Sequence, residues 1–229
     1  MKFRSKRYVV SSRAVEKSKE YEIKEAVSIV KAFEKAKFDE AVDIVMKLGV
    51  DPKHSDQLVR GSFSLPKGIG KEVRVVVFAG GDDKVEMALT AGAVEAGGDD
   101  LLKKVEGGWL DFDVAISTPD MMGKVGKLGR VLGPQGKMPS PKSGTVTNDI
   151  LNTVKEFKEG KIEYRTDAGG NVHVPVGKIS FPDEDLVENI TSFIKHIVGN
   201  RPPAAKGTFV QKISISSSMG PGVRIALAA

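Results

Sequence analysis

The hydrophobic pattern of this chain changes twice, each time beside glycines. Residues 73–79 form an almost continuous, β-branched apolar run soon after Gly68 and Gly70, which is typical of a strand covered on both faces. Predicted helices at 82–89 and 99–106, a second buried strand at 113–117 and a helix at 150–157 then follow, and Gly160 ends this region. Alternating strands and helices joined by short loops predict a parallel sheet with right-handed crossovers.

The two ends of the chain share a different pattern, in which apolar and polar residues alternate within short strands. The N-terminal part predicts an amphipathic helix over 22–36 and strands over 42–48 and 59–65. The C-terminal part predicts a hairpin, with strands at 162–165 and 172–176 around the turn 167–171. A helix over 183–198 and strands over 208–216 and 223–227 complete it.

These patterns predict a fold that combines α/β and α+β parts. We expect an outer α+β domain made from both chain termini, residues 1–66 and 160–229, and an inserted α/β domain, residues 67–159. Insertion at a surface loop is well tolerated because loop ends lie at the domain surface. The pattern alone leaves a tandem arrangement open. In the inserted arrangement, the two glycine-bearing connections would form a natural hinge.

Basic residues are gathered in stretches that contain no acid. Residues 1–15, 121–148 and 189–229 each hold five lysines or arginines and no aspartate or glutamate, in a chain whose net charge is +5. Segregated basic surface is typical of a polyanion-binding protein, because lysine and arginine displace counterions from phosphates. The alternative is a solvated surface that only aids solubility.

The sequence excludes several classes of protein and of site. With 40% apolar and 28% charged residues it predicts a globular, cytoplasmic protein without a secretory signal, and no apolar run is long enough to span a membrane. The absence of cysteine removes disulfides and thiolate chemistry. Neither a dinucleotide fingerprint nor a phosphate-binding loop occurs, and His54, His173 and His196 form no metal-ligand pattern. We therefore expect no enzyme activity, no cofactor and no metal. The alternatives are a nucleotide-binding α/β enzyme and a DNA-binding regulator, although no helix shows a basic recognition face.

Three segments are candidates for contact with nucleic acid. The glycine-, proline- and lysine-rich segment 123–144 predicts an extended, exposed loop that follows a phosphate backbone; alternatively, it caps one end of the sheet. Phe38, beside Lys37, is placed to pack on a base or ribose; alternatively, it is a core residue. The turn 216–222 offers hydroxyls and exposed amides to ribose and phosphate; alternatively, it is a plain serine-rich turn.

At these segments the chain resembles a known family from its basic N-terminus to its last strand. The most specific pieces are Phe38-Asp39-Glu40, Leu48 to Gln57 with Val59-Arg60-Gly61, Leu128 to Pro134, Met138-Pro139 with Pro141-Lys142, Ala205-Lys206-Gly207, and Met219-Gly220-Pro221. Their order and spacing are similar to those of the bacterial large-subunit ribosomal protein one, the "L-one" protein of the mobile ribosomal stalk.

The resemblance implies that the inserted domain is Rossmann-like and that the outer domain binds large-subunit rRNA. It also implies a cytoplasmic protein, present as a monomer in the ribosome beside other ribosomal components, and no membrane partner. Exit-site tRNA, whose release it assists, and its own operon mRNA, whose translation it represses, are the further partners implied. Carried over by motif, the rRNA-binding residues are Lys37, Phe38, Lys53, His54, Arg165, Asp167, Ser216, Ser217, Ser218, Met219 and Gly220.

The chain departs from the family pattern at a few of these places. Serines occupy positions 216–218 where threonines are usual, which keeps the hydroxyls and loses the methyl groups. Leu58 replaces an asparagine, and Ala168 follows Asp167 where a lysine is common. In the glycine-rich segment Gln135, Lys137 and Ser140 replace arginine, leucine and asparagine, so positive charge moves by two positions.

Overall fold

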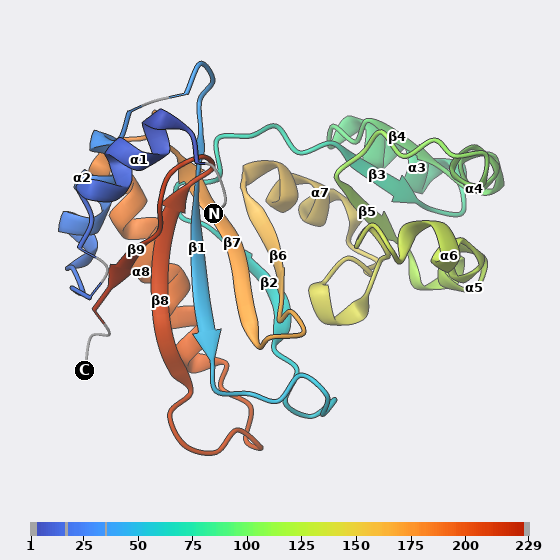
Figure 1. The fold of residues 1–229 in the computed structure, drawn as a ribbon. Helices are drawn as coiled ribbons and strands as arrows, with labels where there is room; N and C mark the ends of the chain where they lie inside the picture. Colours follow the sequence, from blue (N-terminus) through green and yellow to red (C-terminus); the bar gives the residue numbers. More distant parts are fainter. Residues whose placement is uncertain (1–3, 17, 35, 227–229) are drawn as a thin grey trace. The chain divides into compact units, whose positions relative to one another are not determined.

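The structure is a computed structural model that describes residues 4–16, 18–34 and 36–226. It divides the chain into two compact units, shown in Figure 1. Unit 1 consists of Met1–Gly70 and Glu163–Ala229, and unit 2 consists of Lys71–Ile162. The first junction therefore lies after Gly70, and the second lies within strand β6 (Lys161–Arg165). The sequence pattern had predicted these junctions a few residues earlier, after residues 66 and 159.

Unit 1 is built on a four-stranded antiparallel sheet in the order β7-β1-β8-β9. Its strands are β1 (Ala41–Leu48), β7 (Asn171–Lys178), β8 (Val210–Ser217) and β9 (Val223–Ile225). Alternate residues of β1 are fully buried, as the period-two pattern predicted: Val42, Ile44, Met46 and Leu48. Helices α2 (Ile23–Ala32) and α8 (Asp183–Gly199) pack against this buried face, and Figure 1 shows both on the same side of the sheet.

Among the described residues, no long helix packs against the other face of this sheet. The intervening residues of β1, including Asp43, Val45 and Lys47, remain partly accessible to solvent. Val45 of β1 has two neighbours on the adjacent strands, His173 of β7 and Ser214 of β8. We call this surface the open face.

Two further parts complete unit 1. Strands β2 (Arg60–Ser64) and β6 form a separate two-stranded sheet, in which Tyr164 packs edge-on against Phe193 of α8. A short helix, α1 (Lys6–Arg13), lies in the basic N-terminal stretch, for which the sequence pattern gave no helix. Its N-cap, Ser5, accepts a hydrogen bond from the backbone N–H of Tyr8, and this bond satisfies a donor in the first helical turn.

Unit 2 contains a three-stranded parallel sheet in the order β4-β3-β5, formed by β3 (Val75–Phe78), β4 (Glu95–Gly97) and β5 (Val114–Ser117). Helices α3 (Asp82–Thr90), α4 (Asp99–Glu106) and α7 (Ile150–Glu159) connect and cover the strands. Val76 and Phe78 of β3 enter one core cluster, while Val75 and Val77 enter another. The strand is therefore covered on both faces, and the predicted α/β fold class is confirmed. Strand β4 was not among the strands predicted from the sequence.

The glycine-rich segment differs from its prediction. Residues 123–144 were expected to form an extended loop, yet their first part is helical. After η1 (Pro119–Met121), the helical turns α5 (Met122–Val125), η2 (Gly126–Leu128) and α6 (Gly129–Leu132) follow one another, and η3 (Pro141–Ser143) comes later. Val125, Leu128 and Leu132 are buried in the core of unit 2. They recur every three or four residues, so the helical spacing of the apolar side chains prevailed over the high glycine content.

Candidate RNA-binding surface

The serine turn, Ser216–Gly220, is docked on the first residues of β1. Ser217 pairs with Val42 in the sheet, and the backbone N–H of Ser218 donates to the carbonyl of Ala41 at 3.0 Å. The Ser218 hydroxyl also accepts a hydrogen bond from the Ala41 N–H at 3.1 Å. These contacts continue the β1–β8 ladder beyond its end, so the turn is held in a defined place.

A buried carboxylate joins this turn to the segment before β1. Glu40, only 3% exposed, accepts hydrogen bonds from the backbone N–H groups of Ala36 at 2.8 Å and Met219 at 3.0 Å. Burial by itself would raise the pKa of Glu40, but the hydroxyl of Ser217, these two N–H groups and the positive charge of Arg7 together hold the pKa below its ordinary value. Glu40 is therefore an ionised anchor between the 36–40 segment and the serine turn.

The anchored segments present apolar side chains to solvent. Phe38 is 55% exposed and Met219 is 52% exposed, and both belong to the segments that Glu40 holds together. The alternative interpretation of Phe38 as a core residue is therefore wrong. Lys37 is also exposed, and among the described residues its side chain has no ion-pair partner. This end of the sheet offers an aromatic ring, a thioether and a cation to a partner.

The serines and the glycine of the turn have different surroundings. The hydroxyls of Ser217 and Ser218 are engaged by Glu40 and Ala41, whereas Ser216 lies beside Asp43 on the open face and, within the described parts of the chain, its hydroxyl has no hydrogen-bond partner. A Cβ at Gly220 would lie 2.5 Å from the Ser217 hydroxyl and 3.0 Å from the Phe33 ring. Glycine is required there for packing inside the protein.

The remaining predicted residues lie at the opposite end of the sheet. The Lys53–His54 corner follows β1 in a turn built on Asp51, whose carboxylate accepts the Lys53 N–H at 3.0 Å. Arg165, at the end of β6, is exposed, and among the described residues its guanidinium has no hydrogen-bond or ion-pair partner. The side chains of Lys53 and Arg165 are thus both exposed on the surface at this end of the sheet.

Asp167 is occupied by the hairpin that contains it. Its carboxylate accepts the backbone N–H groups of Gly169 at 2.8 Å and Asn171 at 2.7 Å, and the side chains of Asn171 and His173 donate to it as well. These bonds, above all those from Asn171, lower the pKa of Asp167 well below its usual range. Asp167 therefore shapes the turn between β6 and β7.

The structure thus collects the predicted residues into two groups at opposite ends of the sheet. Strand β1 separates them: Ala41 lies beside the serine turn and Leu48 beside the hairpin, about 23 Å apart at roughly 3.3 Å per residue. The open face lies between the groups and carries cationic side chains that the sequence reasoning missed, namely Lys47, Lys212 and Arg224. These three residues occupy the polar positions of strands in which polar and apolar residues alternate. That alternation was the sequence signal that could have assigned them to the open face.

Unit 2 uses part of its basic charge internally. Lys124 pairs with Asp99 at 2.6 Å, and Lys137 donates to the carbonyl of Leu110 at 2.9 Å. At the carboxyl end of β3, Asp82 and Asp83 occupy the first turn of α3, where a bound pyrophosphate would need free amides. Over the described ranges, no cluster of three or more metal-ligating side chains is present. No described helix is long and apolar enough to cross a membrane.

The comparison with known protein families gives a match over most of the chain. The model of the ribosomal protein L1p/L10e family matches residues 30–221 of the 229. The matched range contains Glu40, the 36–40 segment, the Lys53–His54 corner, the hairpin at Asp167 and the whole serine turn. This family comprises structural, non-enzymatic proteins of the large ribosomal subunit that bind rRNA. The chain belongs to the ribosomal protein L1p/L10e family.

Proposed function

We propose that unit 1 binds a folded element of the large-subunit rRNA through the serine turn and the 36–40 segment. The observation that carries this proposal is the ionised Glu40, which holds two chain segments together while Phe38 and Met219 stay exposed above them. Exposed apolar side chains on a fixed backbone suit stacking against bases and riboses, since little conformational entropy is lost on binding.

Each predicted residue has a distinct part in this proposal. Phe38 and Met219 pack against bases or riboses, and Ser216 offers its hydroxyl from the open face. Lys37, Lys53, His54 and Arg165 lie near phosphates and give the affinity its salt dependence. The remaining predicted residues support the site indirectly, by holding the serine turn and the hairpin in shape. Their polar groups or backbone positions already make contacts within the protein; these residues are Ser217, Ser218, Gly220 and Asp167.

The finer biological role rests on the family resemblance. We propose that the protein acts in the cytoplasm as a monomer within the ribosome, where it forms the mobile stalk near the tRNA exit site. There it assists the release of deacylated tRNA. It also represses translation of its own operon mRNA, through an mRNA element that mimics the rRNA site.

A binding titration at several salt concentrations tests the rRNA proposal. The full-length protein would be titrated with the stalk-base rRNA fragment, an unrelated RNA hairpin and duplex DNA. We expect tight binding to the stalk fragment alone, with affinity that falls steeply as salt rises. Equal, weak binding to all three would leave only a generic basic surface and would overturn the proposal.

A further inference from the structure

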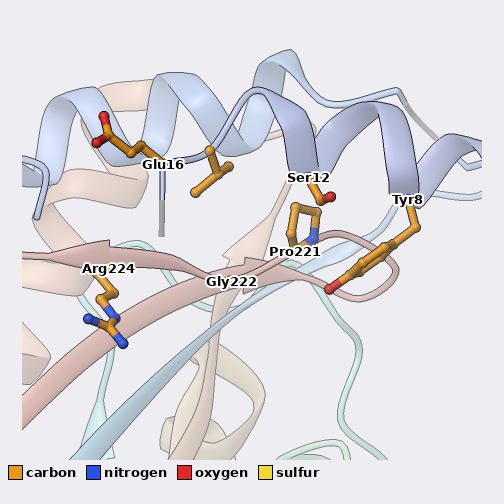
Figure 2. A pocket seen from close by; sticks show the side chains of 7 residues that line it. Tyr8, Ser12, Glu16, Pro221, Gly222 and Arg224 are labelled. Carbon is orange, nitrogen blue, oxygen red and sulfur yellow. The ribbon is translucent and has the colours of Figure 1, made fainter. Parts of the chain in front are cut away.

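Unit 1 contains a cavity that the predicted site does not include. It has a volume of about 260 Å³ and lies between helix α1 and the chain that follows the serine turn. Figure 2 shows α1 alongside this chain, with the ring of Tyr8 reaching from the helix toward Pro221 and Gly222. Buried Val15 contributes an apolar wall. The other residues around the cavity are Ser12, Glu16 and Arg224.

The side chains around the cavity suit a flat, electron-rich ligand that carries negative charge. Within the described residues, the Tyr8 hydroxyl and the Arg224 guanidinium have no hydrogen-bond or ion-pair partner. The guanidinium of Arg4 lies 4.7 Å from the centroid of the Tyr8 ring, which adds positive charge beside it. Glu16 is the one acid at the cavity, and Figure 2 shows its carboxylate directed away from Pro221 and Gly222.

The cavity is continuous with the proposed rRNA surface. Pro221 directly follows Gly220 of the serine turn, so the same stretch of chain forms both sites. Helix α1 lies near this turn, since its residues Tyr8 and Ser12 line the same cavity as Pro221. An RNA strand held at Met219 would therefore need only a short path to reach the cavity.

The cavity lies almost wholly beyond the part of the chain that matches the family model. The match covers residues 30–221, so Pro221 is its last residue, while Tyr8, Ser12, Glu16 and Arg224 fall outside it. Family membership by itself therefore assigns no role to this pocket.

We propose that the pocket receives one unpaired nucleotide of the bound RNA, with its base packed against the Tyr8 ring and its phosphates near Arg224 and the cations of α1. Stacking on a tyrosine ring tolerates any base, because every base has a π-face, so the pocket recognises an unpaired nucleotide as a class. The proposal rests on the proposed function, since the nucleotide belongs to an RNA that the serine turn already holds.

Three variants of the full-length protein test the stacking contact with the stalk-base rRNA fragment. Tyr8→Leu keeps apolar volume but removes the aromatic face, and we expect it to weaken binding by about tenfold, as loss of one stacked base does. Tyr8→Phe keeps the ring and should stay within about threefold of wild type, the loss of one neutral hydrogen bond at most. Val10→Ala, at an exposed position of the same helix outside the cavity, is the matched control and should bind like wild type.

A second measurement does not depend on any protein variant. Each unpaired nucleotide of the fragment would be replaced in turn by an abasic one. We expect one position at which the abasic change weakens wild-type binding about tenfold but has no further effect on Tyr8→Leu, because both changes remove the same stacking contact. If no position behaves in this way, or if Tyr8→Leu binds as tightly as wild type, the pocket does not hold a nucleotide of this RNA.

The outcomes separate this inference from the proposed function. Wild-type binding that does not distinguish the fragment from an unrelated hairpin would overturn both. Specific binding that is lost in Met219→Asp but kept in Tyr8→Leu would leave the rRNA proposal standing and overturn the pocket. Saturable binding of free AMP that Tyr8→Leu abolishes, without any effect of Tyr8→Leu on RNA affinity, would assign the pocket to a free nucleotide and also overturn the inference.

Discussion

The carboxylate of Glu40 accepts a hydrogen bond from the backbone N–H of Met219 at 3.0 Å, although 179 residues separate them in the sequence. This bond fixes the serine turn to the segment that carries Phe38. It places the most exposed apolar side chains of the proposed site on one rigid base, so the integrity of the site depends on a residue that a ligand does not touch.

Glu40→Gln should destabilise the protein by about 1–3 kcal/mol at pH 7, because a buried acceptor of several hydrogen bonds loses its charge. Urea unfolding followed by far-UV circular dichroism measures the change. Glu34→Gln is the matched control, since Glu34 is an exposed glutamate near the same segment. Equal stability of wild type and Glu40→Gln would show that the ionised carboxylate does not anchor the turn.

The effect of Glu40 should also depend on pH. Its pKa in the folded protein lies below the unfolded value of about 4.3, so on acidification the unfolded state binds a proton first. The stabilisation is therefore fully present above about pH 4.3 and is lost as the pH falls through the folded pKa. The difference in unfolding free energy between wild type and Glu40→Gln should shrink in this acidic range. A difference that grows on acidification would contradict the assignment.

Met219→Asp should weaken binding to the stalk-base rRNA fragment by about 1–3 kcal/mol, because an exposed apolar contact is replaced by a charge that repels phosphate. Its side chain is exposed, so the fold should be unaffected, which distinguishes this variant from Ser218→Val, where the bond from Ala41 is lost as well. Met87→Asp, at a similarly exposed methionine of unit 2, is the control. Unchanged affinity in both turn variants would remove the turn from the site.

Asp167→Ala should weaken rRNA binding, whereas Asp167→Asn should keep most of it, if Asp167 acts by shaping the hairpin. An asparagine retains the side-chain oxygen that accepts the N–H groups of Gly169 and Asn171, while alanine removes it. Fluorescence-anisotropy titrations of both variants measure this rescue. Equal losses of affinity in the two variants would instead indicate that the negative charge itself takes part in binding.

Leu132→Ala should destabilise unit 2 by about 2–5 kcal/mol, because the side chain is fully buried in the glycine-rich segment. Trp109 packs against the same cluster and is the one tryptophan of the sequence, so its emission reports the unfolding of this unit directly. Lys127→Ala, at an exposed position of the same segment, should leave the transition unchanged. An unshifted transition in Leu132→Ala would argue that the helical turns do not contribute to the core.

Local pattern predicted most of the secondary structure correctly. Three elements show a pattern that is typical of only one kind of secondary structure. These are the polar–apolar alternation of β1, the apolar face of α8 and the continuous apolar run of β3. The pattern was misleading at 123–132, where glycines suggested an extended loop although Val125, Leu128 and Leu132 recur at helical spacing. Burial of those side chains outweighed the low helix propensity of glycine.

The sequence by itself determined the mixed α/β fold class, the strand and helix pattern and, through its motifs, the family. Only the tertiary structure decided that Phe38 is exposed, that Glu40 anchors Met219, and that the predicted residues form two groups at opposite ends of one sheet. The physical reason is that periodicity reports which face of an element is buried, whereas contacts between residues far apart in sequence depend on how the elements pack. The pocket at Tyr8 is of the second kind, since its walls come from the two ends of the chain.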